Sequence, residues 1–179
     1  MMRNRLATRL ATTTLILTAG LLGATSSVSW SQHGHGHPGG HQAAEACSAE
    51  FDQVVGEGRG FGLAFAADQN GYPGPMHVLE LKDRLQLTAD QEAKAQALMQ
   101  AMFAESKPKG ARLLDAEAKL RRLFADRTAD DPAVRAAVAD VERARAEVRL
   151  VHLLAHLKTR AILTEDQRRI YHEARWSAR

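Results

Sequence analysis

The feature that most constrains this chain is its stretch of about 100 residues from Met76 to the C-terminus, which contains almost no helix breakers. It has two prolines, Pro108 and Pro132, and one glycine, Gly110. The remainder is rich in alanine, leucine, glutamate, arginine and lysine, the residues with the highest helix propensities. No segment shows the alternation of apolar and polar residues that is typical of a β-strand. The sequence therefore predicts an all-α fold.

Apolar residues at helical spacing predict four helices, over about residues 76–86, 88–125, 132–161 and 164–176. A proline inside a helix removes a hydrogen bond and clashes with the preceding turn, so we expect a kink or break near Pro108. At about 1.5 Å per residue the third helix would be roughly 45 Å long. Helices this long and thin bury little surface in a single core, so we expect a homodimer.

Two of the helix starts carry the same capping signal, Leu-Thr-x-x-Gln, at Thr88 with Gln91 and at Thr164 with Gln167. In a capping box the hydroxyl accepts a hydrogen bond from the backbone three residues on, and the glutamine side chain bonds back. Asp131 before Pro132 predicts an N-cap with proline at the first helical position. We interpret all of these residues as structural caps and not as parts of a functional site.

The first 29 residues have the three-part layout of a secretory signal peptide. They contain Arg3, Arg5 and Arg9 and no acidic residue, followed by an apolar run and then small residues. We predict cleavage after Ser29 and a periplasmic protein. An uncleaved N-terminal membrane anchor is the alternative, although the apolar run is short for a span of ~20 residues. The chain has 24 basic and 21 acidic residues, so without these three arginines the charges balance at 21 each, and we expect no nucleic-acid partner.

Residues 30–75 differ in composition from the helix-rich stretch after them. Ten of the 13 glycines lie between Gly34 and Gly74, and glycine-rich chain is costly to order, so we predict a flexible arm and linker. The histidines of this arm are candidate ligands of a loose metal site, with a solubilising tail as the alternative; they are His33, His35, His37 and His41. Cys47, the only cysteine, is predicted to be a free thiol, with an intermolecular disulfide or a metal ligand as alternatives.

His152 and His156 lie one helical turn apart, so their imidazoles share one face of the third helix. Zinc proteases have this spacing with a glutamate directly after the first histidine, but this chain has leucine there, which excludes that hydrolase class. Two such histidines can supply two of the four ligands of Zn²⁺ or a similar cation. If the first helix lies beside the end of the third, His77 supplies another, and Met76 or Glu80 completes the set. The alternative is a pair packed in the core.

The two Leu-Thr-x-x-Gln copies give the chain a resemblance to the LTxxQ family. The stretches LELKDRLQLTADQ and HLKTRAILTEDQRRIY carry the motif, and the resemblance covers about residues 72–176. The family includes Spy/CpxP-type periplasmic chaperones, zinc-resistance-associated proteins and CnrX-type cobalt and nickel sensors. The resemblance implies a four-helix hooked hairpin with long kinked helices, which forms an antiparallel dimer shaped as a curved cradle. The residues that match the motif are Leu87, Thr88, Gln91, Leu163, Thr164 and Gln167.

The resemblance also implies a role in envelope stress or heavy-metal tolerance, through binding of non-native envelope proteins, of divalent metal ions, or of both. A sensor of zinc, copper, nickel or cobalt that acts through a membrane signalling partner is the alternative. As in the cobalt and nickel sensors, the candidate residues His77, His152 and His156 lie on the first and third helices. The tract of the arm is similar to the histidine-rich stretches of the zinc-resistance members. No metal is expected to be required for folding.

A chaperone would present flexible aliphatic side chains on a concave face. The residues expected there are Leu98, Met99, Met102, Leu113 and Leu120. Basic residues around the middle of the second helix form either a rim for acidic or unfolded partners or a solvated face; they are Lys107, Lys109, Arg112, Lys119, Arg121 and Arg122. The sequence has no nucleophile elbow, phosphate-binding loop or Cys-x-x-Cys redox motif, so we expect no enzymatic activity.

Overall fold

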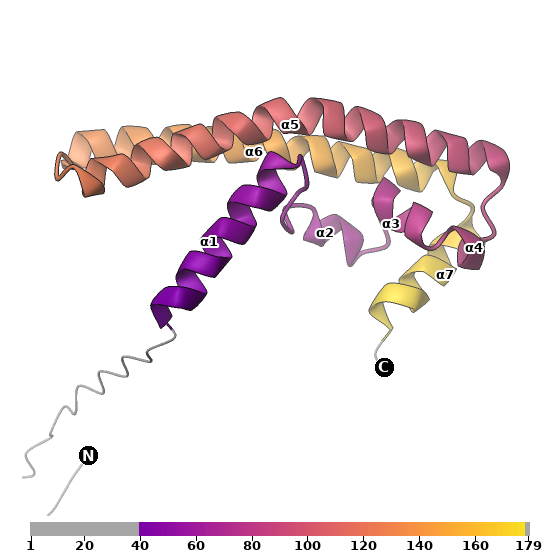
Figure 1. Ribbon diagram of the computed structural model, residues 1–179. Coiled ribbons are helices and arrows are strands. Elements are labelled where there is room, and N and C mark those ends of the chain that lie inside the picture. Colours follow the sequence, from indigo (N-terminus) through magenta and orange to yellow (C-terminus); the bar gives the residue numbers. More distant parts are fainter. Residues whose placement is uncertain (1–39, 178–179) are drawn as a thin grey trace, which may run out of the picture. The chain divides into compact units, whose positions relative to one another are not determined.

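The computed structural model describes residues 40–177, and this part of the chain contains helices and turns but no β-strand (Figure 1). Its helices are α1 (Gly40–Gly56), α2 (Phe65–Asp68), α3 (Pro75–Glu80), α4 (Lys82–Leu85), α5 (Ala89–Ala125), α6 (Asp131–Ile162) and α7 (Glu165–Trp176). The predicted all-α fold is therefore confirmed. The predicted signal peptide lies outside the described residues. Among residues 40–177, no helix combines the length and the apolar character that a membrane span needs.

The body of the fold is a hairpin of two long antiparallel helices. α5 has 37 residues and α6 has 32, so they extend about 55 Å and 48 Å. Figure 1 shows the two helices side by side along their lengths. The buried apolar residues of α6 recur at helical spacing, at Val141, Val148, Val151 and Ala155. Both helices agree closely with the predicted second and third helices.

α5 continues through Pro108 without a break, so the predicted interruption is wrong. A proline in a helix removes the hydrogen bond to the carbonyl four residues earlier. Here that carbonyl belongs to Ala104, and both residues are exposed, so water can replace the lost partner. Figure 1 shows α5 as one gently curved helix.

α6 begins one residue earlier than the sequence predicted. Asp130, not Asp131, is the N-cap, and its side chain accepts a hydrogen bond of 2.8 Å from the backbone N–H of Ala133. Pro132 therefore occupies the second helical position, where a backbone N–H has no intrahelical partner in any case. The N-cap is therefore Asp130 instead of the predicted Asp131, and Pro132 lies in the first turn of the helix, one position later than predicted.

Short helices flank the hairpin at one end and form the hook. The predicted first helix is divided into α3 and α4 because the backbone leaves the helical region at Leu81. Gln86 then adopts a left-handed conformation, with φ 49°, and ends α4. α7 follows a turn after α6 and contacts α4. The buried core of the hook consists of Val78, Leu85, Ala95, Leu163 and Tyr171. The hooked hairpin implied by the resemblance is present.

The two Leu-Thr-x-x-Gln copies meet at the base of the hook. Thr88 and Thr164 each accept a hydrogen bond of 3.2 Å from the glutamine N–H three residues on, and both capping boxes are complete. The glutamines also bond to each other. Gln91 Nε2 donates to Gln167 Oε1 at 2.8 Å, and Gln167 Nε2 donates to Gln91 Oε1 at 2.9 Å. Each Nε2 has a second acceptor, a carbonyl at the end of α6 or of α4. The predicted caps are confirmed, and they also join α4, α5, α6 and α7.

Residues 40–75 belong to the segment predicted as a flexible arm and linker, and in the structure they form α1, α2 and turns that pack against the hairpin. α1 docks where Gly110 leaves a gap in the side chains of α5. A Cβ on Gly110 would lie 2.5 Å from the carbonyl oxygen of Val55, so only glycine permits this approach. Val55 is fully buried there in a cluster with Leu113. Gly58, Gly60 and Gly74 belong to the glycine-rich segment that suggested flexibility, and they also allow close packing, since a Cβ on each would lie within 3.1 Å of another atom.

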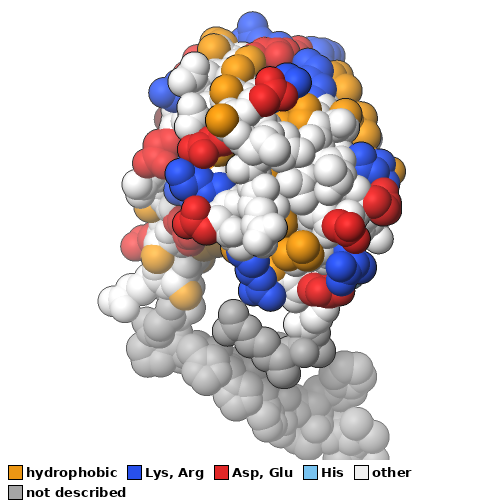
Figure 2. All heavy atoms as spheres, turned by 90° about the vertical axis from the view of Figure 1, so that its right-hand side faces the viewer, with side chains coloured by type: hydrophobic (Ala, Val, Ile, Leu, Met, Phe, Trp, Pro, Cys, Tyr) orange, Lys and Arg blue, Asp and Glu red, His pale blue; other side chains and the backbone are white. Residues whose placement is uncertain are grey.

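The surface at the hook end carries charges of both signs. Figure 2 shows acidic and basic side chains interspersed over this face. On α5 and α7, which begin there, exposed ion pairs span one helical turn, such as Lys94 with Asp90 at 2.6 Å and Arg169 with Glu173 at 3.0 Å. Exposed pairs of this kind contribute about 0–1 kcal/mol each. This face is therefore a solvated surface with little effect on stability.

Candidate metal site

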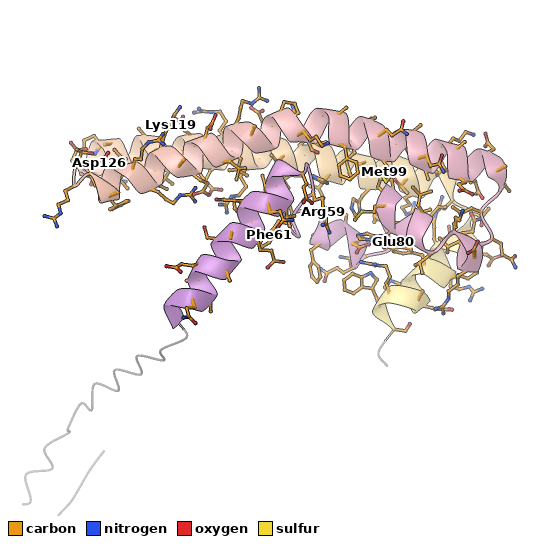
Figure 3. All side chains as sticks on the ribbon, in the orientation of Figure 1. Arg59, Phe61, Glu80, Met99, Lys119 and Asp126 are labelled. Carbon is orange, nitrogen blue, oxygen red and sulfur yellow. The ribbon has the colours of Figure 1, made fainter. Side chains whose placement is uncertain are left out.

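A cavity of about 600 Å³ opens between the segment that follows α1 and the hairpin with its hook. Residues 50–68 line one side, and α3, α5, α6 and α7 contribute the others. Figure 3 labels two of the lining residues, Arg59 and Phe61, close to the end of α1, whereas Lys119 and Asp126 lie far along α5. The three histidines predicted as a core site all line this cavity; they are His77, His152 and His156.

His152, on α6, is buried with 5% of its surface exposed, and its Nε2 atom has no hydrogen-bond partner. The carbonyl of Gly58 interacts with the imidazole from the loop after α1. Burial, aided by the nearby His156, lowers the pKa of His152 to about 4. The ring is therefore neutral at pH 7, and Nε2 is a buried ring nitrogen without a hydrogen-bond partner.

His156, one turn further along α6, is held by the backbone before α3. Its Nδ1 lies 2.6 Å from the carbonyl oxygen of Tyr72, and a carbonyl only accepts, so Nδ1 carries the proton. Arg160 stacks on the Tyr72 ring at 4.8 Å and helps to fix this segment. Burial lowers the pKa of His156, although the bond to Tyr72 opposes the shift. A Cβ on Gly74 would lie 2.8 Å from Nε2, so glycine leaves open the space in front of this atom.

The two imidazoles therefore share one arrangement. Each is buried beside a backbone carbonyl, that of Gly58 for His152 and that of Tyr72, which meets Nδ1, for His156, and both residues line the cavity. Metal-binding histidines are oriented in this way, because the second nitrogen donates to a carbonyl or carboxylate that sets the ring position. A neutral ring is also the form that binds a metal. The residues present thus fit two ligands of a single cation.

His77 lies near this pair without being arranged as a third ligand. Its Nδ1 is 3.2 Å from Oε2 of Glu80, one turn along α3. His77 makes a small contribution to the lowered pKa of His156. Within residues 40–177, no three side chains of His, Cys, Asp or Glu converge closely enough to hold one ion. The three-histidine site stays a prediction, while the structure brings its members to one cavity.

Asp68 of α2 is a buried carboxylate on the cavity wall that sequence analysis did not find. One of its oxygens accepts a hydrogen bond from the Tyr171 hydroxyl, and the other accepts one of 3.2 Å from Arg175. Burial and the bond to Asp68 raise the pKa of Tyr171 above its usual range. These bonds fasten α2 to α7 across a separation of 103 residues, so no local sequence pattern could predict them.

The predicted loose site of the arm is not covered by the structure. His33, His35 and His37 lie outside the described residues, as does the side chain of His41. Cys47 is an exposed free thiol on α1, in agreement with the simpler of its predictions.

The basic residues in the middle of α5 fit the solvated-face interpretation. Arg112 forms an ion pair with Glu147 on α6 at 3.0 Å, and Arg121 lies 3.7 Å from Asp52 on α1. Lys109 lies 3.6 Å from Glu105 on its own helix. Half of the predicted cationic rim is thus neutralised by acidic neighbours.

Two of the residues predicted to face a protein client are instead buried. Leu113 is fully buried with Val55 of α1, and Met102 is 8% exposed and packs against α6. The prediction is wrong for both because α1 and α6 cover these positions. The exposed aliphatic stripe lies on α6, at Leu150, Leu154 and Leu157, which are 56%, 43% and 52% exposed.

Comparison with known proteins agrees with a metal-related role. A family model described as heavy-metal resistance matches residues 59–169. No curated protein and no solved structure is detectably similar to the chain. The matched range begins in the loop after α1 and includes both histidines of α6 and both Leu-Thr-x-x-Gln copies. The chain therefore belongs to the heavy-metal resistance family of LTxxQ, Spy/CpxP-type proteins.

Proposed function

We propose that this protein binds metal ions in the periplasm as part of heavy-metal tolerance, and that it acts by binding and not by catalysis. The observation that carries the proposal is the pair His152 and His156, two buried imidazoles that line one cavity, with Nε2 of His152 unpartnered and Nδ1 of His156 held by Tyr72. Membership of the heavy-metal resistance family supports the role. The signal-peptide layout of the first 29 residues supports export.

The test requires the full chain, since residues 59–68 line the cavity and a shorter protein would lose that wall. Competing ligands are removed by five substitutions, which define the background protein: His33→Ser, His35→Ser, His37→Ser, His41→Ser and Cys47→Ser. Calorimetric titration of this background protein with Zn²⁺, Cu²⁺, Ni²⁺, Co²⁺ and Ag⁺ should give about one tightly bound ion per chain for at least one of them.

Two variants identify the ligands. His152→Asn and His156→Asn keep a side-chain N–H near the position of Nδ1 and remove Nε2, so the bonds to the backbone can persist while the ligand is lost. Each should abolish tight binding with the thermal unfolding midpoint nearly unchanged. His172→Asn, at an exposed position on α7, is the matched control and should bind normally. Failure of the background protein to bind any of the ions would sink the proposal.

A metal sensor is the second candidate, because His156 is bonded directly to the segment that enters α3. The space in front of its Nε2 adjoins Gly74, so a bound ion would press on residues 72–75. An ion shifts such a packing equilibrium only if it prefers one of the two states. Hydrogen exchange of residues 72–80 should then change when metal is added; equal exchange with and without metal would leave binding alone as the function.

The leucine stripe on α6, at Leu150, Leu154 and Leu157, is the surface that best supports a homodimer. These residues recur at the four- and three-residue spacings that place side chains on one face of a helix. A second copy of α6 presents the same stripe, as a two-fold interface requires. Binding of non-native proteins stays a prediction, and this stripe is the surface it would use.

A further inference from the structure

The donor atoms of the cavity indicate which kind of cation it takes, given that His152 and His156 bind one as proposed above. Besides the two imidazoles, two methionines line the same cavity, Met76 from α3 and Met102 from α5. Met102 packs against Val151 and Ala155, the residues directly before the two histidines, so its side chain lies along the same stretch of α6. A methionine has three rotatable bonds, which lets its sulfur reach a neighbouring ligand position.

Two carboxylates, Glu50 and Asp68, line the cavity. Asp68 already accepts hydrogen bonds from Tyr171 and Arg175. Two arginines, Arg59 and Arg175, also line the cavity, so its carboxylates leave no excess of negative charge. The cost of burying a cation rises with the square of its charge, and neutral imidazole and thioether ligands offset none of that charge. The electrostatics therefore favour a monovalent ion over a divalent one.

Ligand softness leads to the same class of ion. Thioether sulfur and imidazole together suit Cu(I) and the chemically similar Ag(I), whereas hard carboxylate and water ligands suit other metals. We propose that the cavity selects a soft monovalent cation, Cu(I) or Ag(I), bound by Nε2 of His152 and His156 and by the thioether of Met102, with Met76 as a fourth donor. No change of oxidation state is involved.

The test uses the background protein, in which the exposed thiol of Cys47 and the arm histidines no longer compete. Cu(I) affinity is measured by competition with a coloured Cu(I) chelator in the absence of air, and Ag(I) affinity by calorimetry in chloride-free buffer. Zn²⁺, Ni²⁺ and Co²⁺ are titrated in parallel. The affinity for each monovalent ion should be at least about 100-fold higher than the affinity for any of the three divalent ions.

Met102→Leu tests the sulfur ligand, because leucine fills a similar volume without a donor atom. It should lower Ag(I) and Cu(I) affinity by about 10-fold or more and leave the weak divalent binding unchanged. Met99→Leu, on the same helix but not on the cavity wall, is the control and should bind normally. X-ray absorption of the Cu(I) form should show sulfur next to the metal, and this signal should fall in Met102→Leu.

The outcomes separate this inference from the proposed function. Divalent ions that bind as tightly as Ag(I) would overturn the selectivity while leaving metal binding in place. Normal Ag(I) affinity and an unchanged absorption spectrum in Met102→Leu would overturn the sulfur ligand. Absence of binding for all five ions would overturn both proposals together. Thermal unfolding of each variant, recorded alongside, excludes a folding defect as the cause of any loss.

Discussion

At the residue scale, the space in front of His156 Nε2 decides whether this imidazole can reach a metal ion. Gly74 has φ −79° and ψ 155°, a conformation that any residue adopts, so its role is not backbone flexibility. What matters is the missing side chain, because a Cβ would lie 2.8 Å from Nε2. Zinc lies about 2.0–2.1 Å from a ligand nitrogen, so a methyl group at this position competes with the ion.

Gly74→Ala should therefore weaken metal binding by about 10-fold or more, and it should also lower the unfolding midpoint, because the added methyl group lies 2.8 Å from the buried ring of His156. Calorimetric titration of the background protein with and without the substitution measures the effect. Gly40→Ala is the control, since a Cβ there meets no atom within 4 Å. Unchanged affinity in Gly74→Ala would place the ion elsewhere than in front of His156.

The histidine pair could be predicted from the sequence because a four-residue spacing on a helix is a local property. The residues that position the two imidazoles for metal binding could not be predicted from the sequence. Gly58, Tyr72 and Gly74 reach His152 and His156 from more than 80 residues away, through contacts that exist only in the folded chain. In the sequence these residues look like parts of a glycine-rich linker, the composition that was interpreted as flexible.

At the element scale, the docking of α1 depends on Gly110. An alanine at this position has two opposing effects on the free energy of unfolding. In an exposed helix, glycine to alanine is stabilising by about 1 kcal/mol, since alanine has the higher helix propensity. Here the added Cβ would meet the backbone of Val55 at 2.5 Å, and a backbone atom cannot rotate away. The steric effect on α1 should outweigh the gain within α5.

Gly110→Ala is thus predicted to displace α1, with faster hydrogen exchange over residues 50–60 and a lower free energy of unfolding. Gly56→Ala gives the matched comparison, because its Cβ would lie 3.7 Å from Leu114, an ordinary contact. Exchange mass spectrometry of both variants checks the expectation. A Gly110→Ala protein that is more stable than the parent, with unchanged hydrogen exchange in α1, would show that α1 does not pack directly against Gly110.

The paired glutamines are the second feature at this scale. Replacing Gln167 by leucine removes its bonds to Gln91, to the N–H of Thr164 and to the carbonyl of Leu85. Buried polar groups left without partners cost about 1–3 kcal/mol each. Gln167→Leu should therefore lower the free energy of unfolding by about 2–4 kcal/mol, measured in urea. Gln96→Leu on exposed α5 surface should change it by less than about 0.5 kcal/mol.

The boundaries of α5, α6 and α7 were predictable because caps are encoded in adjacent residues. Both Leu-Thr-x-x-Gln copies start a helix as expected. The contact between the copies was not predicted, since nothing in either one specifies its partner. α1 was missed for a related reason: its helical sequence lies between glycines, and the packing against α5 that holds it is a tertiary effect.

At the scale of the whole molecule, the leucine stripe of α6 leaves three large apolar side chains in water. Exposed single leucines are ordinary, but a row along one helix face is typical of an interface. The homodimer proposed above would cover this row with its copy in a second chain. The stripe lies on a different face of α6 from the buried His152 and His156, so dimerisation and metal binding can be tested separately.

Leu154→Glu should convert a dimer to a monomer, because it places a charge in the centre of the stripe. Sedimentation velocity over a range of protein concentrations measures the change. Val138→Glu is the matched control: Val138 has the same 43% exposure on the same helix, but lies outside the stripe. A parent protein that is monomeric at all concentrations would contradict the dimer, and the stripe would then be examined for binding of non-native proteins.

The most direct measurement of the metal site is nitrogen NMR of the histidine rings in the background protein. Without metal, His152 and His156 should both appear as neutral rings with the proton on Nδ1 at pH 7. One equivalent of Ag(I) should shift the Nε2 resonances of these two rings, leave both Nδ1 protons in place, and leave His172 unaffected. Unshifted Nε2 resonances for His152 and His156, with metal bound elsewhere, would contradict the assignment of these two residues as the ligands.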